Sequence, residues 1–213
     1  YCYFDSDQTD DMFKKLTSRS DINYSRYFFF HANYLNSKNN KKKVKKILDT
    51  SLNSYPKNLI LNQLKIDLAQ KKILKNQFDC KDSTHVVAEI LYIVANGLAI
   101  QENYEASNFY LNLAKYLNPN FISFETLHAN NFFAIDEYNE AKKTYEKMQK
   151  YGSIYSWYAS KQNTLILIQQ EKKEEAISFL KKSFYKIKNP TTYEIFDYAE
   201  FLKNNNKYKE SIT

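Results

Sequence analysis

Apolar and small side chains recur along this chain every 34 or 35 residues, and this period constrains the fold more than any other feature. The clearest copy starts at Ala88 and reads as a helix, a turn at residues 102–104 and a second helix that ends before Asn118. Its inward-facing residues are expected to be Leu91, Val94, Ala95, Leu98, Ser107, Leu111 and Ala114. Other copies start at Ser25, Ile122, Trp157 and Thr192. Such periods are typical of proteins that stack one supersecondary unit.

The pattern predicts an all-α fold, a right-handed α-solenoid of antiparallel helix pairs that bury one another's apolar faces. Residues 1–24 are expected to hold part of an earlier helix or repeat, and residues 58–87 to form one helix over 58–74, a junction loop over 76–83 and a helix N-cap at Ser83. This half repeat is a candidate hinge. The helix pairs are predicted at residues 25–57, 88–121, 122–156, 157–191 and 192–213, the last cut short.

The spacing of the small, aromatic and proline residues carries a family resemblance. The turns into the second helices read Tyr104-Glu105-Ala106, Tyr138-Asn139-Glu140-Ala141 and Lys173-Glu174-Glu175-Ala176. Residues 25–213 resemble the tetratricopeptide repeat, and their order is similar to large multi-repeat proteins of this kind in alphaproteobacteria. The family's usual glycine is missing, and only Pro56 and Pro119 stand at its closing proline position. The resemblance implies a non-catalytic scaffold that binds another protein, and the cut-short last repeat suggests an internal fragment of a longer chain.

In tetratricopeptide repeats the first helices of the pairs line a concave groove that holds a partner segment. The resemblance places an asparagine at the same groove position three times, and its amide can both donate to and accept from an extended peptide backbone. The candidate groove residues are Asn33, Tyr92, Asn96, Asn130, Phe133, Tyr158, Lys161 and Tyr193, with Phe196 nearby. The family's carboxylate clamp is not expected, because Leu165 stands where the clamp needs asparagine beside Lys161.

A cluster of lysines is the alternative binding surface. It consists of Lys41, Lys42, Lys43, Lys45 and Lys46, which surround Val44, Ile47 and Leu48 at helical spacing. An ordinary solvated helix face is expected, for which the acidic stretch from Asp5 to Asp11 is a candidate partner; the alternative is contact with nucleic acid or lipid headgroups. The net charge is +7, but of 31 basic residues only Arg19 and Arg26 are arginines. Because arginine makes the bidentate phosphate and base contacts, nucleic-acid binding is not expected.

The sequence carries few patterns that are typical of a catalytic site. No zinc-protease, paired-cysteine, phosphate-loop or nucleophile-elbow motif is present, so an enzyme, a metal site and a cofactor are not expected. Cys2 and Cys80 are one possible disulfide pair, but because they stand so far apart in a helical chain they are expected to be free thiols. Thiol chemistry by Cys80 with His85 is a third alternative for function. His31 and His128 are expected to pack inside helix interfaces.

The sequence shows little evidence of a membrane-spanning or a targeting segment. The longest apolar stretch, residues 86–100, is interrupted by Glu89, Asn96 and Gly97, so no membrane span is expected. The first residue is Tyr1, and residues 1–24 show no charged segment followed by an apolar one, so the compartment is not read from this end. The compartment stays open between bacterial cytoplasm and periplasm.

Overall fold

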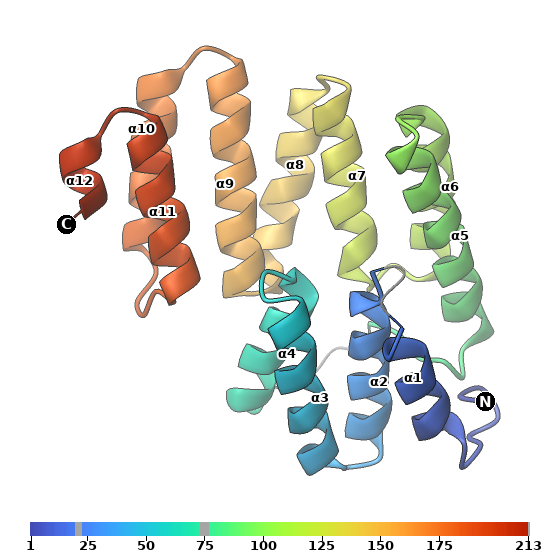
Figure 1. Cartoon of the computed structure of the whole chain (residues 1–213). Coiled ribbons are helices and arrows are strands. Elements are labelled where there is room, and N and C mark those ends of the chain that lie inside the picture. The colour runs from blue at the N-terminus through green and yellow to red at the C-terminus, as the bar shows by residue number, and fades with distance from the viewer. Residues whose placement is uncertain (20–22, 73–76, 213) are drawn as a thin grey trace. The chain divides into compact units, whose positions relative to one another are not determined.

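The computed structural model describes residues 1–19, 23–72 and 77–212. Over these residues it contains twelve α-helices, one short 3-10 helix and no strand, which confirms the all-α prediction (Figure 1). Consecutive helices pack against each other in pairs. The chain divides into two compact units, residues 1–127 and 128–213, with the division inside α7 (Ile122–Ala134).

In residues 1–127 the α2 helix packs against three others. Its buried residues Phe28, Ala32 and Leu35 share a core with Val44 and Leu48 of α3, as the repeat pattern predicts. A second pair, α5 with α6, approaches closely because alanines and a serine line the contact. The helices of this unit before α7 are α1 (Thr9–Thr17), α2 (Ser25–Ser37), α3 (Lys41–Ser54), α4 (Leu59–Ala69), α5 (Ser83–Ile100) and α6 (Tyr104–Leu117).

In residues 128–213 each helix after α7 packs against the next one. Ala141, Tyr145 and Met148 of α8 are fully buried, and Trp157, Leu180, Tyr198 and Leu202 form a cluster that joins α9, α10 and α11. The helices are α8 (Tyr138–Met148), η1 (Gln149–Tyr151), α9 (Ser153–Gln169), α10 (Lys173–Tyr185), α11 (Thr192–Asn204) and α12 (Tyr208–Ile212). The first helix of the segment predicted as a cut-short pair, residues 192–213, is α11.

Six helices end in one and the same backbone turn. In each turn one residue has a φ between 52° and 62°, and the next N–H bonds to the carbonyl five residues earlier, as Asn103 does to Leu98 at 2.9 Å. This is the Schellman arrangement, which satisfies carbonyls that a helix end leaves unpaired. The left-handed residues are Asn39, Lys71, Glu102, Asp136, Glu171 and Asn206. Successive turns are 31 to 35 residues apart, so the sequence period is also a period of the backbone.

The junction after the third helix differs in detail from the prediction. Asn58 caps α4 by accepting the N–H of Leu61 at 3.1 Å, but α4 ends at Ala69, short of the predicted 74. Residues 73–76 lie outside the described part of the chain. The next helix begins one residue early, because Asp82 rather than Ser83 is its N-cap and accepts the N–H of Thr84.

Two expectations are wrong. Cys2 and Cys80 are not free thiols but form a disulfide, because the turn before α1 reaches the loop before α5. Val94, predicted to face inward, is 41% exposed, whereas Ala88 and Ala95 of the same helix are fully buried.

The α5 helix is unusually apolar for its exposure. It is 18 residues long with a mean hydropathy of 1.4, so by length and composition alone it could cross a membrane. That is weak evidence, since core helices of soluble proteins pass the same test. Exposed side chains include Val87, Ile90 and Ile93. Glu89 of the same helix is buried and pairs with Arg26 of α2.

Candidate functional site

The amide of Asn130 is the best-defined polar group among the candidate groove residues. Its Oδ1 atom accepts two hydrogen bonds of 2.8 Å, one from the Tyr145 hydroxyl on α8 and one from the Tyr158 hydroxyl on α9. Burial raises the pKa of both tyrosines, so both hydroxyls stay protonated and act as donors. Asn130 itself is exposed. Because the oxygen is held by two donors, the amide is fixed with its N–H groups left for another acceptor.

The remaining candidates in residues 128–213 lie on α7, α9 and α11. Phe133 is half-buried against Tyr138, with ring centroids 5.7 Å apart. The Lys161 ammonium pairs with Asp197 of α11, whose Oδ2 atom also accepts the indole N–H of Trp157 at 3.3 Å. Tyr193 is 48% exposed and Phe196 61% exposed. The first helices of three successive pairs thus carry these side chains.

The three candidates in residues 1–127 lie on two helices, Asn33 on α2, and Tyr92 and Asn96 one turn apart on α5. Asn33 lines a cavity beside α1. Tyr92 packs under the Arg26 guanidinium, 3.9 Å from the ring centroid, and against Phe124. Arg26 and Asn33 are separated by about 10 Å along α2, at about 1.5 Å per residue. Asn96 is half-buried on α5. Tyr92 is therefore a packing residue, and the eight predicted groove residues do not form one described surface.

Two partners in this region escape sequence reasoning. Tyr145 is not among the predicted groove residues, yet its hydroxyl orients Asn130. Asp197 is not predicted at all, and it engages both Lys161 and Trp157. Asp197 follows Lys161 by 36 residues, close to one period, so equivalent positions on successive first helices are the signal that finds this pair.

The lysine cluster on α3 is exposed, as expected for a solvated face. Lys43 is engaged by Asp10 of α1 at 2.8 Å, and Lys38 in the preceding turn pairs with Asp5 at 2.7 Å. The expected pairing with the acidic stretch is therefore present, but it uses only one member of the cluster. Within the described residues the other four have no ion pair; they are Lys41, Lys42, Lys45 and Lys46.

The predicted pairing of a free Cys80 thiol with His85 is wrong. The sulfur of Cys80 is bonded to Cys2, and the His85 Nδ1 atom accepts the backbone N–H of Asp79 at 3.0 Å. Neither group is available as a nucleophile and base. No group of three or more metal-ligating side chains occurs among the residues that the structure describes.

The chain matches no protein-family model and none of the curated proteins.

Proposed function

We propose that this protein is a non-catalytic scaffold that holds an extended segment of a partner protein across α7, α9 and α11. The proposal further takes the helix pairs to stack as a right-handed solenoid of the tetratricopeptide kind. Its supports are the six equivalent turns and the paired contacts of successive helices, together with the sequence resemblance. In such a stack, successive first helices share one face.

The observation that carries the proposal is the fixed amide of Asn130. An extended peptide presents backbone carbonyls at regular intervals, and it needs donors whose direction is set before binding. The Tyr145 and Tyr158 hydroxyls hold the amide oxygen, so the two amide N–H groups are oriented without a partner present. A donor fixed in this way loses little side-chain entropy when it binds a carbonyl.

The chemistry around Asn130 favours an apolar, uncharged partner segment. Tyr193 and Phe196 expose aromatic rings on α11, which supply contact area at low entropic cost. The positive charge of Lys161 is already neutralised by Asp197, so Lys161 offers no free cation for a terminal carboxylate. The partner is therefore expected to bind through its backbone and apolar side chains.

The test separates donation by Asn130 from its role in packing. Random peptides displayed on phage would be selected on the full chain, and the dissociation constants of the enriched peptides measured by calorimetry. Asn130→Asp keeps an oxygen for both tyrosines but removes the N–H donors, and should weaken binding by about tenfold, a loss near 1.4 kcal/mol. Asn139→Asp, at an exposed site on α8, is the matched control and should leave affinity unchanged. If Asn130→Asp and Asn139→Asp bound the selected peptides with equal affinity, the proposed peptide-binding groove would be refuted.

The lysine cluster is the competing candidate, favoured by the four lysines that no described acidic residue engages. If it is the functional surface, anionic vesicles or nucleic acid should bind the chain, and Lys42→Glu with Lys46→Glu should remove that binding. The contact should also disappear at about 1 M salt, where the Debye length falls to about 3 Å. Peptide binding that persists in such salt favours the scaffold instead.

A further inference from the structure

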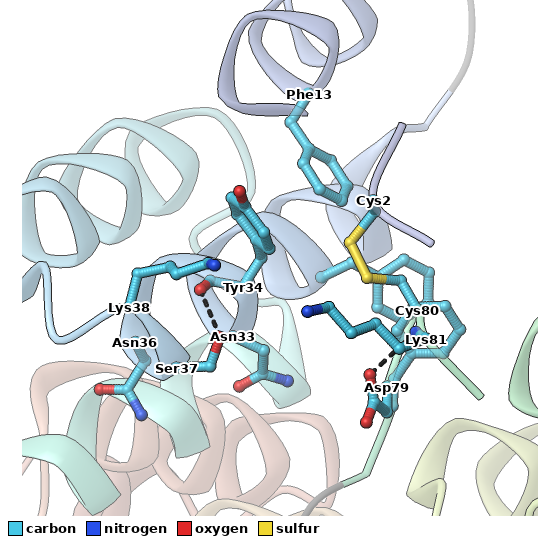
Figure 2. A pocket seen from close by; sticks show the side chains of 12 residues that line it. Cys2, Phe13, Asn33, Tyr34, Asn36, Ser37, Lys38, Asp79, Cys80 and Lys81 are labelled. Carbon is cyan, nitrogen blue, oxygen red and sulfur yellow. Dashed lines mark hydrogen bonds between the residues drawn. A yellow bond between two sulfur atoms is a disulfide. The ribbon is translucent and has the colours of Figure 1, made fainter. Parts of the chain in front are cut away.

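A cavity of about 460 Å³ lies in residues 1–127 between α1, α2 and the loop that leads into α5 (Figure 2). It is separate from the face proposed for peptide binding, since none of its lining residues belongs to α7, α9 or α11. Small-molecule sites typically enclose about 300 to 1,000 Å³, so the volume suits a compact organic ligand rather than a single ion.

The wall of the cavity is aromatic. Phe30 of α2 stacks on Phe78 of the loop with ring centroids 3.9 Å apart, and Phe13 of α1 faces Tyr34 at 6.1 Å. The Cys2–Cys80 disulfide closes the side where the N-terminal turn meets the loop. Such a wall favours a flat or branched apolar body over a sugar or a hydrated ion.

The rim of the cavity is cationic. Figure 2 shows Lys38 and Lys81 reaching in from opposite sides, one from the end of α2 and one from the loop. Their ammonium groups meet at one atom, Oδ2 of Asp5, at 2.7 Å and 3.1 Å. Hydrogen bonds from Lys38 and Lys81 lower the pKa of Asp5. A carboxylate therefore already occupies the position between the two ammonium groups.

We propose that this cavity binds a small monocarboxylic acid with an aromatic body, whose carboxylate takes the place of the Asp5 carboxylate between Lys38 and Lys81. The aromatic body would lie against Phe30 and Phe78. The side chain of Asp5 is partly exposed, on a turn of the N-terminal segment, and can move to water when it is displaced.

The charges on the lining residues set the ligand at one negative charge. Lys38 and Lys81 contribute two positive charges and Asp79 contributes one negative charge, and the Asp79 Oδ1 atom accepts the backbone N–H of Lys81 at 2.9 Å. Asp5 contacts the two ammonium groups but is not itself a lining residue, so the lining carries a single positive charge. A monoanion balances that charge, whereas a dianion would place an unpaired charge beside Asp79. Asn33, which also lines the cavity, can supply a neutral donor or acceptor.

The test uses 3-phenylpropionate as the probe and its neutral amide, 3-phenylpropanamide, as the matched ligand control. Binding to the full chain would be measured by calorimetry, and the site located from amide chemical-shift changes in NMR spectra. Wild-type chain should bind the acid more tightly than the amide, with shifts confined to Asn33, Phe78 and their neighbours. Equal binding of acid and amide, or shifts elsewhere, would overturn the proposal.

Asp5→Asn is the most discriminating variant, because it removes the carboxylate that competes with the ligand and leaves Lys38 and Lys81 in place. It should tighten binding of 3-phenylpropionate several-fold, whereas a purely structural Asp5 would give weaker binding or none. Lys38→Gln with Lys81→Gln should abolish the preference for the acid, and Lys45→Gln on exposed α3 should not. Exposed ion pairs contribute little to stability, so all these variants should stay folded. Unchanged affinity in Asp5→Asn would contradict the proposed displacement.

Discussion

The Oδ1 atom of Asp10 lies 2.7 Å from the Nε2 atom of His31, whose side chain is only 1% exposed. Asp10 thus joins α1 to α2, and it also accepts hydrogen bonds from Lys14 and Lys43. Burial alone would raise the pKa of Asp10, but the hydrogen bonds from Lys43, Lys14 and His31 outweigh it and hold that pKa well below its usual range. Burial lowers the pKa of His31, against the opposing effect of Asp10.

These two shifts predict that the fold loses stability in acid. The unfolded chain takes up a proton on His31 near its ordinary pKa of 6.5, while the folded chain resists that proton, so the unfolded state binds more protons as the pH falls. The same sign holds for Asp10, whose contribution is present above its ordinary pKa of 3.8 and is lost below it. The free energy of unfolding should therefore fall between about pH 7 and 5, and fall again below about pH 4.

Urea unfolding at several pH values measures this dependence, and an NMR titration of the His31 ring measures its midpoint directly. His31→Gln removes the titrating group and should flatten the slope between about pH 7 and 5. Asp10→Asn should flatten the acidic limb. An NMR midpoint of His31 above 6.5 would reverse the sign and refute the account.

The disulfide between Cys2 and Cys80 should contribute measurably to the stability of residues 1–127. It links residues 78 apart in the sequence, so it closes a long loop in the unfolded chain. Loops of this size are associated with about 2 to 4 kcal/mol of stabilisation. The variant with serine at both positions should lower the urea midpoint accordingly, and thiol titration of the unreduced wild-type chain should find no free thiol. A full complement of free thiols in the oxidised chain would show that the bond does not form.

The left-handed turn residues predict stabilisation by glycine. Glu171 is exposed with a φ of 62°, a conformation that costs a residue with a β-carbon about 1 to 2 kcal/mol. Glycine avoids that cost, but it lowers the free energy of unfolding by about 0.5 to 1 kcal/mol because it loses more conformational entropy on folding. Glu171→Gly should therefore stabilise the fold by about 0.5 to 1 kcal/mol. Glu200→Gly, inside α11, is the control and should destabilise it by about 1 kcal/mol. Destabilisation at both sites would mean that the turn at Glu171 does not adopt this conformation.

Local and periodic features of this fold are predictable from the sequence, because they depend on residues close together in the chain. The turn at Glu102 and the inward alanines of α5 and α6 follow from helical spacing alone. Contacts between distant segments do not, because nothing in the spacing of Cys2 and Cys80 shows that the first turn folds back onto the junction loop. The cavity rim depends on that same return of the chain, which brings Asp5 to Lys38 and Lys81.

The candidate binding face is predictable in the same partial way. Asn130 is found because the position recurs on successive first helices. The bond from Tyr158 crosses between α9 and α7, so it depends on how two pairs pack. Hydrophobic spacing identifies Tyr145 as buried but says nothing of where its hydroxyl points.

The ion pair between Arg26 and Glu89 ties α2 to α5, and its partners should depend on each other strongly. Both side chains are largely buried, and the guanidinium also lies 3.9 Å from the centroid of the Tyr92 ring. Burial raises the pKa of Glu89, against the attraction of Arg26. Arg26→Met leaves a buried carboxyl without its cation, a change that typically costs about 3 to 5 kcal/mol.

The double variant, Arg26→Met with Glu89→Met, separates the contribution of the ion pair to the free energy of unfolding from the cost of leaving one buried charge without its partner. Replacing a buried ion pair with apolar side chains is often neutral or stabilising, because neither charge must leave water. The double variant should therefore be more stable in urea than either single variant, with a coupling of about 0.5 to 3 kcal/mol, the range for contacting residues. If the two single effects simply add, the α2–α5 ion pair does not exist in solution, and Glu89 is solvated there instead.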